Sequence, residues 1–205
     1  MSIINGRIVV AIRPFFYVDI FCACCKKVFF IKQRKSIIYF RDKVKKMKLL
    51  VISDSHRNID NMQYATEHTK PDAIVHLGDH IDDAYELQRL LPGTMIHMVQ
   101  GNCDFQSVAE SELLLTFEGV TVYMTHGHIH DVKSGYDALV KRARQRRADL
   151  ALFGHTHKAI IWEENGLWLM NPGQIGQHGN GCTASYGIVA IENGSFECNI
   201  IDFAG

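Results

Sequence analysis

The sequence predicts an α/β fold in which two β-sheets are covered by helices on the outside. Over residues 49–99, short apolar runs typical of buried strands alternate with helix-compatible segments. This alternation predicts parallel strands joined by right-handed crossovers. Further along, the turn dipeptides Glu118-Gly119, Asn165-Gly166 and Asn193-Gly194 separate apolar runs and predict antiparallel strand pairs. Parallel and antiparallel pairing are therefore both expected.

The alternating part opens with a continuous apolar run, the pattern of a strand covered on both faces. Its predicted elements are a strand at residues 49–52, a helix at 59–69, a strand at 73–77, a helix at 81–91 and a strand at 95–99. In parallel sheets of this kind the working groups gather at the carboxyl ends of the strands.

The remaining elements begin with a hairpin and end with an antiparallel group. They are strands at residues 112–117 and 120–125, a helix at 132–148, and strands at 150–153, 160–162, 167–170, 186–191 and 196–203. The helix at 132–148 ends in five basic residues, which suit the negative carboxyl end of a helix dipole.

The first 46 residues differ in character from the rest. They hold 11 Lys and Arg against 2 Asp and Glu, a net charge of +9, whereas residues 47–205 have a net charge of −9 and contain all 11 histidines. Charged residues interrupt the apolar stretches before position 46, so no run approaches the roughly twenty residues of a spanning helix. We expect residues 1–46 to be a basic extension, non-native or disordered, and residues 47–205 to form the domain.

The six cysteines show no regular spacing, which argues against a disulfide framework and for a reducing, cytoplasmic setting. At 205 residues the chain suits one domain with an appendage.

Side chains that can bind metals follow five of the predicted strands. They are Asp54 with His56, Asp79, Asn102, His126, and His155 with His157. Each has an ordinary explanation alone: a buried histidine is commonly a core residue, and Asp79 or the Asp54 segment can cap a helix. The repeated placement favours one shared site. If extended geometry continues past Ile52, Asp54 and His56 lie on the same side of the backbone.

A set of motifs together resembles the calcineurin-like metallophosphoesterase superfamily, most closely its small YfcE-like phosphodiesterase branch. The motifs are Asp54-X-His56, Gly78-Asp79 with Asp82-Asp83, Gly101-Asn102-X-Asp104, His126-Gly127-His128, Gly154-His155-X-His157 and Asn171-Pro172-Gly173. The resemblance runs from Met47 to near the C-terminus. It implies a four-layer α-β-β-α sandwich of two mixed sheets flanked by helices.

The resemblance also implies a dinuclear metal centre with a metal-bridging hydroxide as nucleophile. One ion would be held by Asp54, His56, Asp79 and His157, and the other by Asp79, Asn102, His126 and His155. Asp79 would then bridge the two ions. Carboxylate, amide and imidazole donors suit manganese, which we expect, and also iron, nickel or zinc.

The sequence departs from the wider superfamily at Cys103, where many members carry a histidine that protonates the leaving group. We therefore expect His128 to be the general acid, with Asp104 as an orienting partner. Cys103 is expected to be a packed side chain rather than a nucleophile. Arg57 adjoins the first motif and either contacts phosphate or stays exposed.

These observations predict a metal-dependent hydrolase of phosphoric esters, most closely a phosphodiesterase acting on a small molecule. Few basic residues adjoin the motifs, which slightly favours a diester monoanion. The alternatives are a phosphomonoesterase and a non-catalytic protein-interaction scaffold like the Vps29-type relatives. All seven ligand positions are filled, which favours catalysis. A nucleic-acid partner is not expected, and a homo-oligomer is left open.

Overall fold

The computed structural model describes residues 46–105, 107–176 and 183–203, together with the backbone of four short strands nearer the N-terminus. The chain divides into two compact units, Met1–Val44 and Lys45–Gly205. The expectation of a non-native or disordered extension falls mostly on residues outside this described part. Within the described residues no helix is both long and apolar enough to span a membrane.

The first unit contains two small antiparallel ladders. Strand β1 (Ser2–Ile4) pairs with β2 (Arg7–Val9), and β3 (Phe21–Cys22) pairs with β4 (Lys27–Val28).

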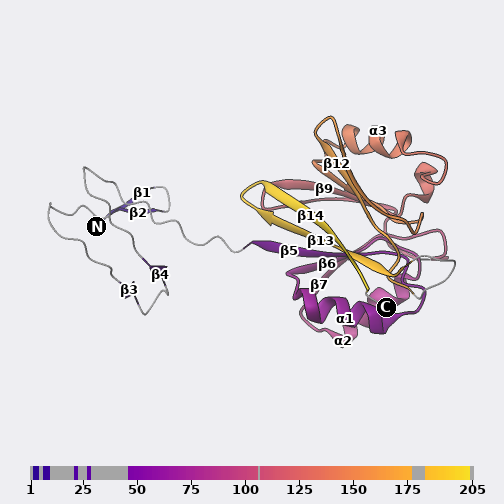
Figure 1. The fold of residues 1–205 in the computed structure, drawn as a ribbon, viewed down its shortest axis with the longest axis horizontal. Helices are drawn as coiled ribbons and strands as arrows, with labels where there is room; N and C mark the ends of the chain where they lie inside the picture. The colour runs from indigo at the N-terminus through magenta and orange to yellow at the C-terminus, as the bar shows by residue number, and fades with distance from the viewer. Residues whose placement is uncertain are drawn as a thin grey trace. The chain divides into compact units, whose positions relative to one another are not determined.

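Two mixed five-stranded sheets form the centre of the second unit (Figure 1). The first has the order β14-β13-β5-β6-β7. Its strands are β5 (Met47–Ile52), β6 (Ala73–His76), β7 (Met95–Met98), β13 (Ser185–Glu192) and β14 (Ser195–Asp202). Strands β5, β6 and β7 are parallel, whereas β13 runs antiparallel to both β5 and β14.

The second sheet has the order β11-β12-β10-β9-β8. Its strands are β8 (Glu112–Phe117), β9 (Val120–Thr125), β10 (Leu150–Leu152), β11 (Ala159–Glu164) and β12 (Leu167–Pro172). Here β10 is parallel to both β9 and β12, and the edge strands β8 and β11 are antiparallel to their neighbours. Each sheet therefore contains three adjacent parallel strands, β5-β6-β7 in the first and β12-β10-β9 in the second.

Helices cover the outer faces of the two sheets, as the sequence predicts. Helices α1 (Ile59–Thr69) and α2 (Ile81–Leu90) lie against the sheet that contains β5, β6 and β7, and α3 (Asp137–Gln145) lies against the other sheet (Figure 1). A short 3₁₀ helix, η1 (His128–His130), follows β9. The four-layer α-β-β-α sandwich is confirmed.

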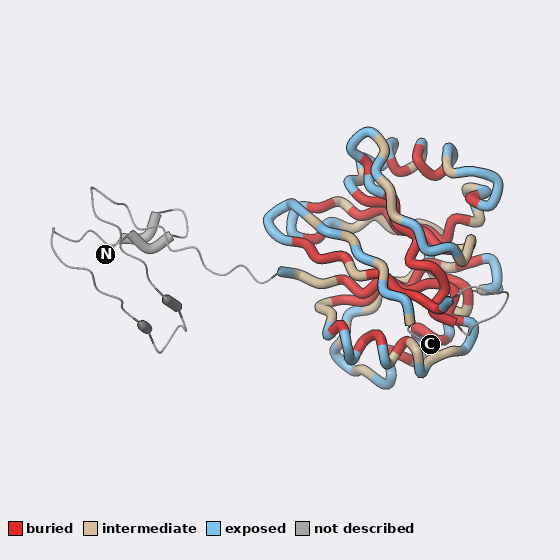
Figure 2. Tube along the Cα trace, viewed as in Figure 1, coloured by how far each residue is buried: buried red, intermediate tan, exposed pale blue. Residues whose placement is uncertain are grey.

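Three apolar clusters hold these layers together, and the buried chain runs through the middle of the unit in Figure 2. Between the sheets, Val51 and Val75 of one sheet belong to the same cluster as Val122 and Leu152 of the other. Alternate residues of the same strands face the helices, because strand side chains point to opposite faces in turn. Leu50, for example, packs in a cluster with residues of α1 and α2.

The helix predicted for residues 132–148 is wrong in its extent, because α3 begins only at Asp137. Asp131 ends η1 with a left-handed backbone at φ 50°, so the chain turns where the prediction continued a helix. Gly135 lies in the intervening turn, which is consistent with the low helix propensity of glycine. The predicted basic end is also cut short, since Arg147 has φ 55°.

Glu112 on β8 is the centre of a polar cluster that joins the second sheet to α3. Its carboxylate accepts hydrogen bonds from Nη2 of Arg142 at 2.6 Å and from the hydroxyl of Tyr123 at 2.6 Å. Nε2 of His130 in η1 lies 3.3 Å from the same carboxylate. The bonds from Arg142 in particular lower the pKa of Glu112 to about 2.

We expect Glu112→Gln to lower the free energy of unfolding at neutral pH by about 1.5–3 kcal/mol, the range for hydrogen bonds to a charged group. Because the folded-state pKa is lowered, this contribution is full above the ordinary value of 4.5 and disappears as the pH falls through about 2. Urea denaturation of both proteins from pH 7 to pH 2 measures the difference.

Glu67→Gln, which alters an exposed carboxylate on α1, is the matched control and should change stability by less than about 0.5 kcal/mol. A difference between wild type and Glu112→Gln that stays constant down to pH 2 would contradict the account.

Candidate metal centre

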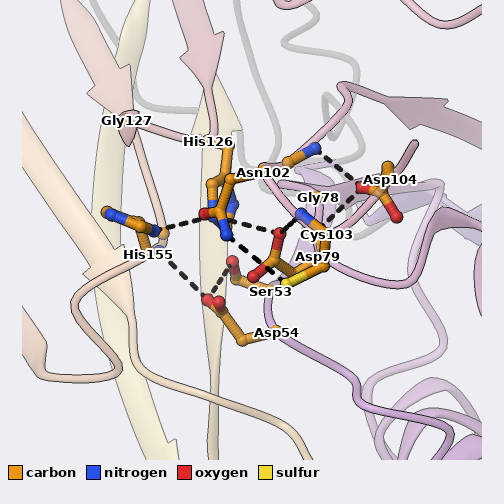
Figure 3. Close-up of polar contacts among 12 residues, drawn as sticks. Ser53, Asp54, Gly78, Asp79, Asn102, Cys103, Asp104, His126, Gly127 and His155 are labelled. Atoms are coloured by element: carbon orange, nitrogen blue, oxygen red, sulfur yellow. Dashed lines mark hydrogen bonds and ion pairs between the residues drawn. The ribbon is translucent and has the colours of Figure 1, made fainter. Parts of the chain in front are cut away.

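The parallel strands of both sheets deliver polar side chains to one place. Asp54 and His56 follow β5, Asp79 follows β6, and Asn102 follows β7. From the other sheet, His126 follows β9, and His155 with His157 follow β10. Figure 3 shows Asp54, Asp79, Asn102, His126 and His155 turned toward one another. The carboxyl ends of five strands thus meet at one site, where such sheets place their functional groups.

Two groups of potential ligand atoms lie at this site within the described residues. Asp54, His56 and His157 form one group, and Asp79, His126 and His155 form the other. In each group the ligand atoms all lie within 4.8 Å of one another. The structure therefore brings all six acidic and histidine candidates together, in the same division that the resemblance implies, with Asp79 placed in the second group.

The second group includes Asn102 by direct contact. Nε2 of His126 lies 3.2 Å from Oδ1 of Asn102, 3.1 Å from Nδ1 of His155 and 3.4 Å from Oδ1 of Asp79. His126 is fully buried and Asp79 nearly so. Three possible ligand atoms from three other strand ends therefore lie within 3.4 Å of Nε2 of His126.

The other ring nitrogen of His126 explains why this arrangement suits a cation. Nδ1 lies 2.8 Å from the carbonyl oxygen of Leu77, and a carbonyl can only accept, so Nδ1 holds the proton of the neutral ring. Nε2 then presents a lone pair toward the oxygens of Asn102 and Asp79. Lone pairs that face one another at such distances repel unless a positive charge lies between them. The hydrogen bond to the Leu77 carbonyl also fixes the orientation of the His126 ring, as such bonds do for metal-binding histidines.

The first group contains a buried carboxylate oxygen without a hydrogen bond. Oδ2 of Asp54 accepts hydrogen bonds from the Ser53 hydroxyl at 2.5 Å and from the backbone N–H of His155 at 3.1 Å. Oδ1 lies 3.1 Å from Nε2 of His157, a close contact that lacks the alignment of a hydrogen bond. Since an orphaned buried carboxylate oxygen is costly, this atom also suits a bound cation.

The pKa shifts at the first group follow the same contacts. Burial alone would raise the pKa of Asp54, but His157, His126 and Ser53 lower it below its ordinary value. The pKa of His157 is raised, chiefly by its contact with Asp54. The pKa of His56 is lowered by burial. The carboxylate is thus held in the ionised form that a metal ligand requires.

Five candidate ligands have a left-handed backbone, so the expectation of extended geometry past Ile52 is wrong. The φ values are 54° at Asp54, 44° at His56, 57° at Asp79, 68° at His155 and 58° at His157. Asp54 and His56 nevertheless converge, because long-range bonds replace the strand pattern: the N–H of Asp54 donates to the carbonyl of Gly78 at 3.1 Å. Non-glycine residues in this region cost roughly 1–3 kcal/mol each and cluster at functional sites.

Glycines allow the strand ends to approach so closely. A Cβ atom at Gly101 would collide with Oδ1 and the backbone nitrogen of Asp79, and one at Gly154 would collide with the Ser53 hydroxyl. Side chains at these two positions would therefore displace Asp79 and Asp54.

Asp104 stabilises the loops of the second group and does not hydrogen-bond to His128 in the described part of the chain. Its carboxylate accepts hydrogen bonds from the backbone N–H groups of Gly101 at 2.7 Å, Ile81 at 2.8 Å and Asp79 at 2.9 Å. Among the hydrogen bonds of the described residues none joins Asp104 to His128. The position of Asp104 fits a residue that fixes the loops carrying Asp79 and Asn102, not the orienting role expected from the sequence.

Asn171, in the motif at the end of β12, braces the loop that follows β10. Its side-chain amide donates to the carbonyl of Gly154 at 2.8 Å and to the hydroxyl of Thr156 at 3.0 Å. Strand β12, which is parallel to β10, therefore stabilises the loop that carries His155 and His157.

A buried chain of hydrogen bonds, which sequence reasoning missed, lies behind the first group. The N–H of Gly78 donates to Nδ1 of His76 at 3.2 Å, so Nε2 holds the proton and bonds the Ser55 hydroxyl at 3.1 Å. That hydroxyl donates to Oδ2 of Asp83 at 2.6 Å, which also accepts the backbone N–H of Arg57 at 2.7 Å. Burial lowers the pKa of His76 to about 4, so the ring stays neutral.

The alternative roles as helix caps do not fit the structure. Oδ1 of Asn58 caps α1 by accepting the N–H of Asn61, and the residue at the start of α2 is His80, without a side-chain cap bond. Asp79 instead accepts the N–H of Cys103 at 2.9 Å.

His128 lies at the edge of the second group. Its ring centroid is 5.4 Å from that of His126 and 6.2 Å from that of His155, and its Nδ1 is buried without a hydrogen bond among the described residues. Burial and His126 lower its pKa. Cys103 is exposed, so the expectation of a packed side chain is wrong. Partial burial and Asp79 raise the pKa of its thiol to about 11, which disfavours a thiolate nucleophile as expected.

Lys133, a second residue that the sequence did not single out, contributes positive charge at the site. Burial, His126 and then Lys133 lower the pKa of His155 to about 4, and Lys133 also opposes the rise in the pKa of His157. Its position in an irregular turn between η1 and α3 gives no periodic pattern, so no sequence signal marks it.

Comparison with known proteins identifies the class. The model of the calcineurin-like phosphoesterase superfamily domain matches residues 47–194, so the chain belongs to this superfamily. A probable metallophosphoesterase, YsnB of Bacillus subtilis, is 35% identical over 162 residues, which cover 78% of this chain and 93% of that protein. The resemblance stated from the motifs is confirmed.

Solved structures place the chain in the same fold. A predicted phosphoesterase from Streptococcus pneumoniae has a TM-score of 0.63 and 27% identity, over 77% of this chain and 90% of that one. The phosphoesterase YfcE from E. coli has a TM-score of 0.55 and 21% identity over 69% and 87%. Vps29 from Entamoeba histolytica, complexed with zinc, has a TM-score of 0.61 and 22% identity. The match covers 77% of this chain and 100% of that one.

We expect Asp83→Ala to lower the free energy of unfolding by about 1.5–3 kcal/mol, because it removes the charged acceptor of the short bonds from the Ser55 hydroxyl and the Arg57 N–H. Urea denaturation measures this loss. Asp82→Ala, which changes the neighbouring but exposed carboxylate of α2, should cost no more than about 1 kcal/mol. Equal losses for the two variants would show that the buried chain has no structural role.

Proposed function

We propose that this protein is a metal-dependent phosphodiesterase with a dinuclear centre. The observation that supports it best is the pair of ligand groups, in which imidazole nitrogens and carboxylate oxygens from four strand ends face one another. Membership of the calcineurin-like phosphoesterase superfamily makes phosphate-ester hydrolysis the natural use of such a site.

Asp54, His56 and His157 would hold one divalent ion, and Asn102, His126 and His155 the other, with Asp79 as the bridge. Two ions there would lower the pKa of a bound water and polarise the phosphoryl group. We propose manganese as the native metal, with iron, nickel and zinc as alternatives, because this mixed donor set fits them all.

The other residues of the site would bind the phosphate or stabilise the loops that carry the ligands. Arg57 has no ion-pair partner among the described residues, and Lys133 supplies the positive charge near His155. These two cations would bind the non-reacting phosphoryl oxygens. Asp104 and Asn171 keep the ligand loops in place through the hydrogen bonds described above.

His128 is the general acid in this proposal. It lies beside His126 and His155, has a free buried ring nitrogen, and is the nearest non-ligand histidine of its loop. It would donate a proton to the departing oxygen of the ester.

We expect Asp79→Asn to reduce bound metal from two ions toward one and to lower kcat for bis(p-nitrophenyl) phosphate at least about a hundredfold, since one carboxylate serves both ions. Plasma mass spectrometry of the purified protein gives the metal content, and steady-state assays with added manganese give kcat.

Asp60→Asn, an exposed carboxylate in the first turn of α1, is the control and should keep both metal and turnover. Two ions and full activity in Asp79→Asn would refute the bridging role. A wild-type protein that binds two ions but hydrolyses neither diesters nor monoesters would instead favour the scaffold function, and preference for monoesters would favour a phosphomonoesterase.

We expect His128→Ala to lower kcat about a hundredfold for a diester with an alkoxide leaving group, because general acid catalysis contributes about 10²–10⁴-fold. Turnover of a p-nitrophenyl ester should change much less, since that leaving group departs without a proton. Assays of both substrates, with metal content measured in parallel, test the role.

His68→Ala removes an exposed histidine from α1 and should affect neither substrate. Equal loss for both leaving groups with full metal content would exclude His128 as the proton donor.

A further inference from the structure

A pocket of about 390 Å³ adjoins the two ligand groups on the side of α2. Its walls come from the residue after His56, the start of α2 and the segment that follows β7. The residues that matter for its chemistry are Arg57, Asp82, Tyr85, Cys103, Phe105 and Val108. The volume lies in the range of roughly 300–1,000 Å³ that small-molecule sites occupy.

The pocket lies beside the candidate metal centre, since two of its lining residues contact candidate ligands. His80, which lines it, has its ring centroid 5.0 Å from that of His56. Cys103, on the opposite wall, donates its backbone N–H to Oδ1 of Asp79 at 2.9 Å. A phosphate ester bound between the two ligand groups would therefore have one of its substituents at the mouth of this pocket.

The outer wall of the pocket is apolar and open to solvent. Phe105 is 88% exposed, Val108 94% and Tyr85 45%. Single exposed apolar residues are ordinary, but three around one pocket beside a polar site mark a binding surface. Covering them with an apolar ligand group removes apolar surface from water, which is favourable.

The backbone next to Phe105 is held by hydrogen bonds, although the Phe105 side chain itself is exposed. Asp104, the neighbour of Phe105, is held by the N–H groups of Asp79, Ile81 and Gly101. The N–H of Ser107 returns to the carbonyl of Asp104 at 3.3 Å. Phe105 therefore stands directly beside the loop that carries Asn102.

Charged groups in the same pocket define the occupant further. The Arg57 guanidinium, without an ion-pair partner among the described residues, can hold a phosphoryl oxygen at the mouth. The exposed carboxylate of Asp82 can accept hydrogen bonds from N–H or O–H groups of a ligand. An occupant with a flat apolar face and a polar edge satisfies both walls.

We propose that this pocket is a subsite for a planar aromatic substituent of the phosphate ester, with Phe105 and Tyr85 in contact with the ring. The inference rests on the proposed phosphodiesterase function and names its substrate class: phosphodiesters that carry an aromatic or heteroaromatic group, rather than purely aliphatic ones.

The test compares phenylphosphonate with methylphosphonate as competitive inhibitors of bis(p-nitrophenyl) phosphate hydrolysis by the full chain. Both carry the same phosphonate group, and their C–P bond resists hydrolysis. The wild-type protein should bind phenylphosphonate at least about tenfold more tightly. In Phe105→Ala/Tyr85→Ala the two inhibition constants should agree within about twofold, with that of methylphosphonate unchanged.

Ile201→Ala, an exposed apolar residue of β14, is the matched control and should keep the tenfold preference. Equal inhibition constants in a wild-type protein that hydrolyses the diester would overturn the subsite and leave the proposed function intact. A preference unchanged in the double variant, or a double variant that only alters the oligomeric state in size-exclusion chromatography, would also overturn it. If the protein hydrolyses no ester and binds neither phosphonate, the proposed function itself fails.

Discussion

The convergence of imidazole nitrogens and carboxylate oxygens at one edge of two sheets is the constraint on which the rest of the structure depends. The carbonyl of Leu77 fixes the proton of His126 on Nδ1, and Nε2 must then face the oxygens of Asn102 and Asp79. Beside it, the buried Oδ1 of Asp54 faces His157 without a hydrogen bond. Without positive charge between them these contacts are unfavourable, so the site is built for cations.

This arrangement requires backbone conformations that are unfavourable in free energy. Five candidate ligands have left-handed backbones, and each such residue costs roughly 1–3 kcal/mol. Buried hydrogen bonds from outside the site offset this cost: Asp104 holds three backbone N–H groups, Asn171 holds the loop after β10, and Asp83 holds the loop after β5. Fixed loops of this kind lose little freedom when a ligand binds, which is the purpose of preorganisation.

Much of the fold was predictable because its signals are local. Continuous apolar runs such as residues 49–52 gave the buried strands, and turn dipeptides such as Asn165-Gly166 gave the hairpins. The convergence of the candidate ligands was predictable from motifs at strand ends. The backbone at Asp54 was not, because the bond from its N–H to Gly78 joins segments far apart in sequence. For the same reason the partners of Asp104 and the buried His76 chain had no sequence signal, and the turn at Asp131 shortened a helix that composition alone extended.

The most direct test is anomalous diffraction from a crystal of the protein grown with manganese. Two anomalous peaks are predicted about 3.5–4 Å apart. One should be bound by Asp54, His56 and His157 and the other by Asn102, His126 and His155, with Asp79 contacting both. No peak at these residues, or a single ion bound without Asp79, would contradict the account.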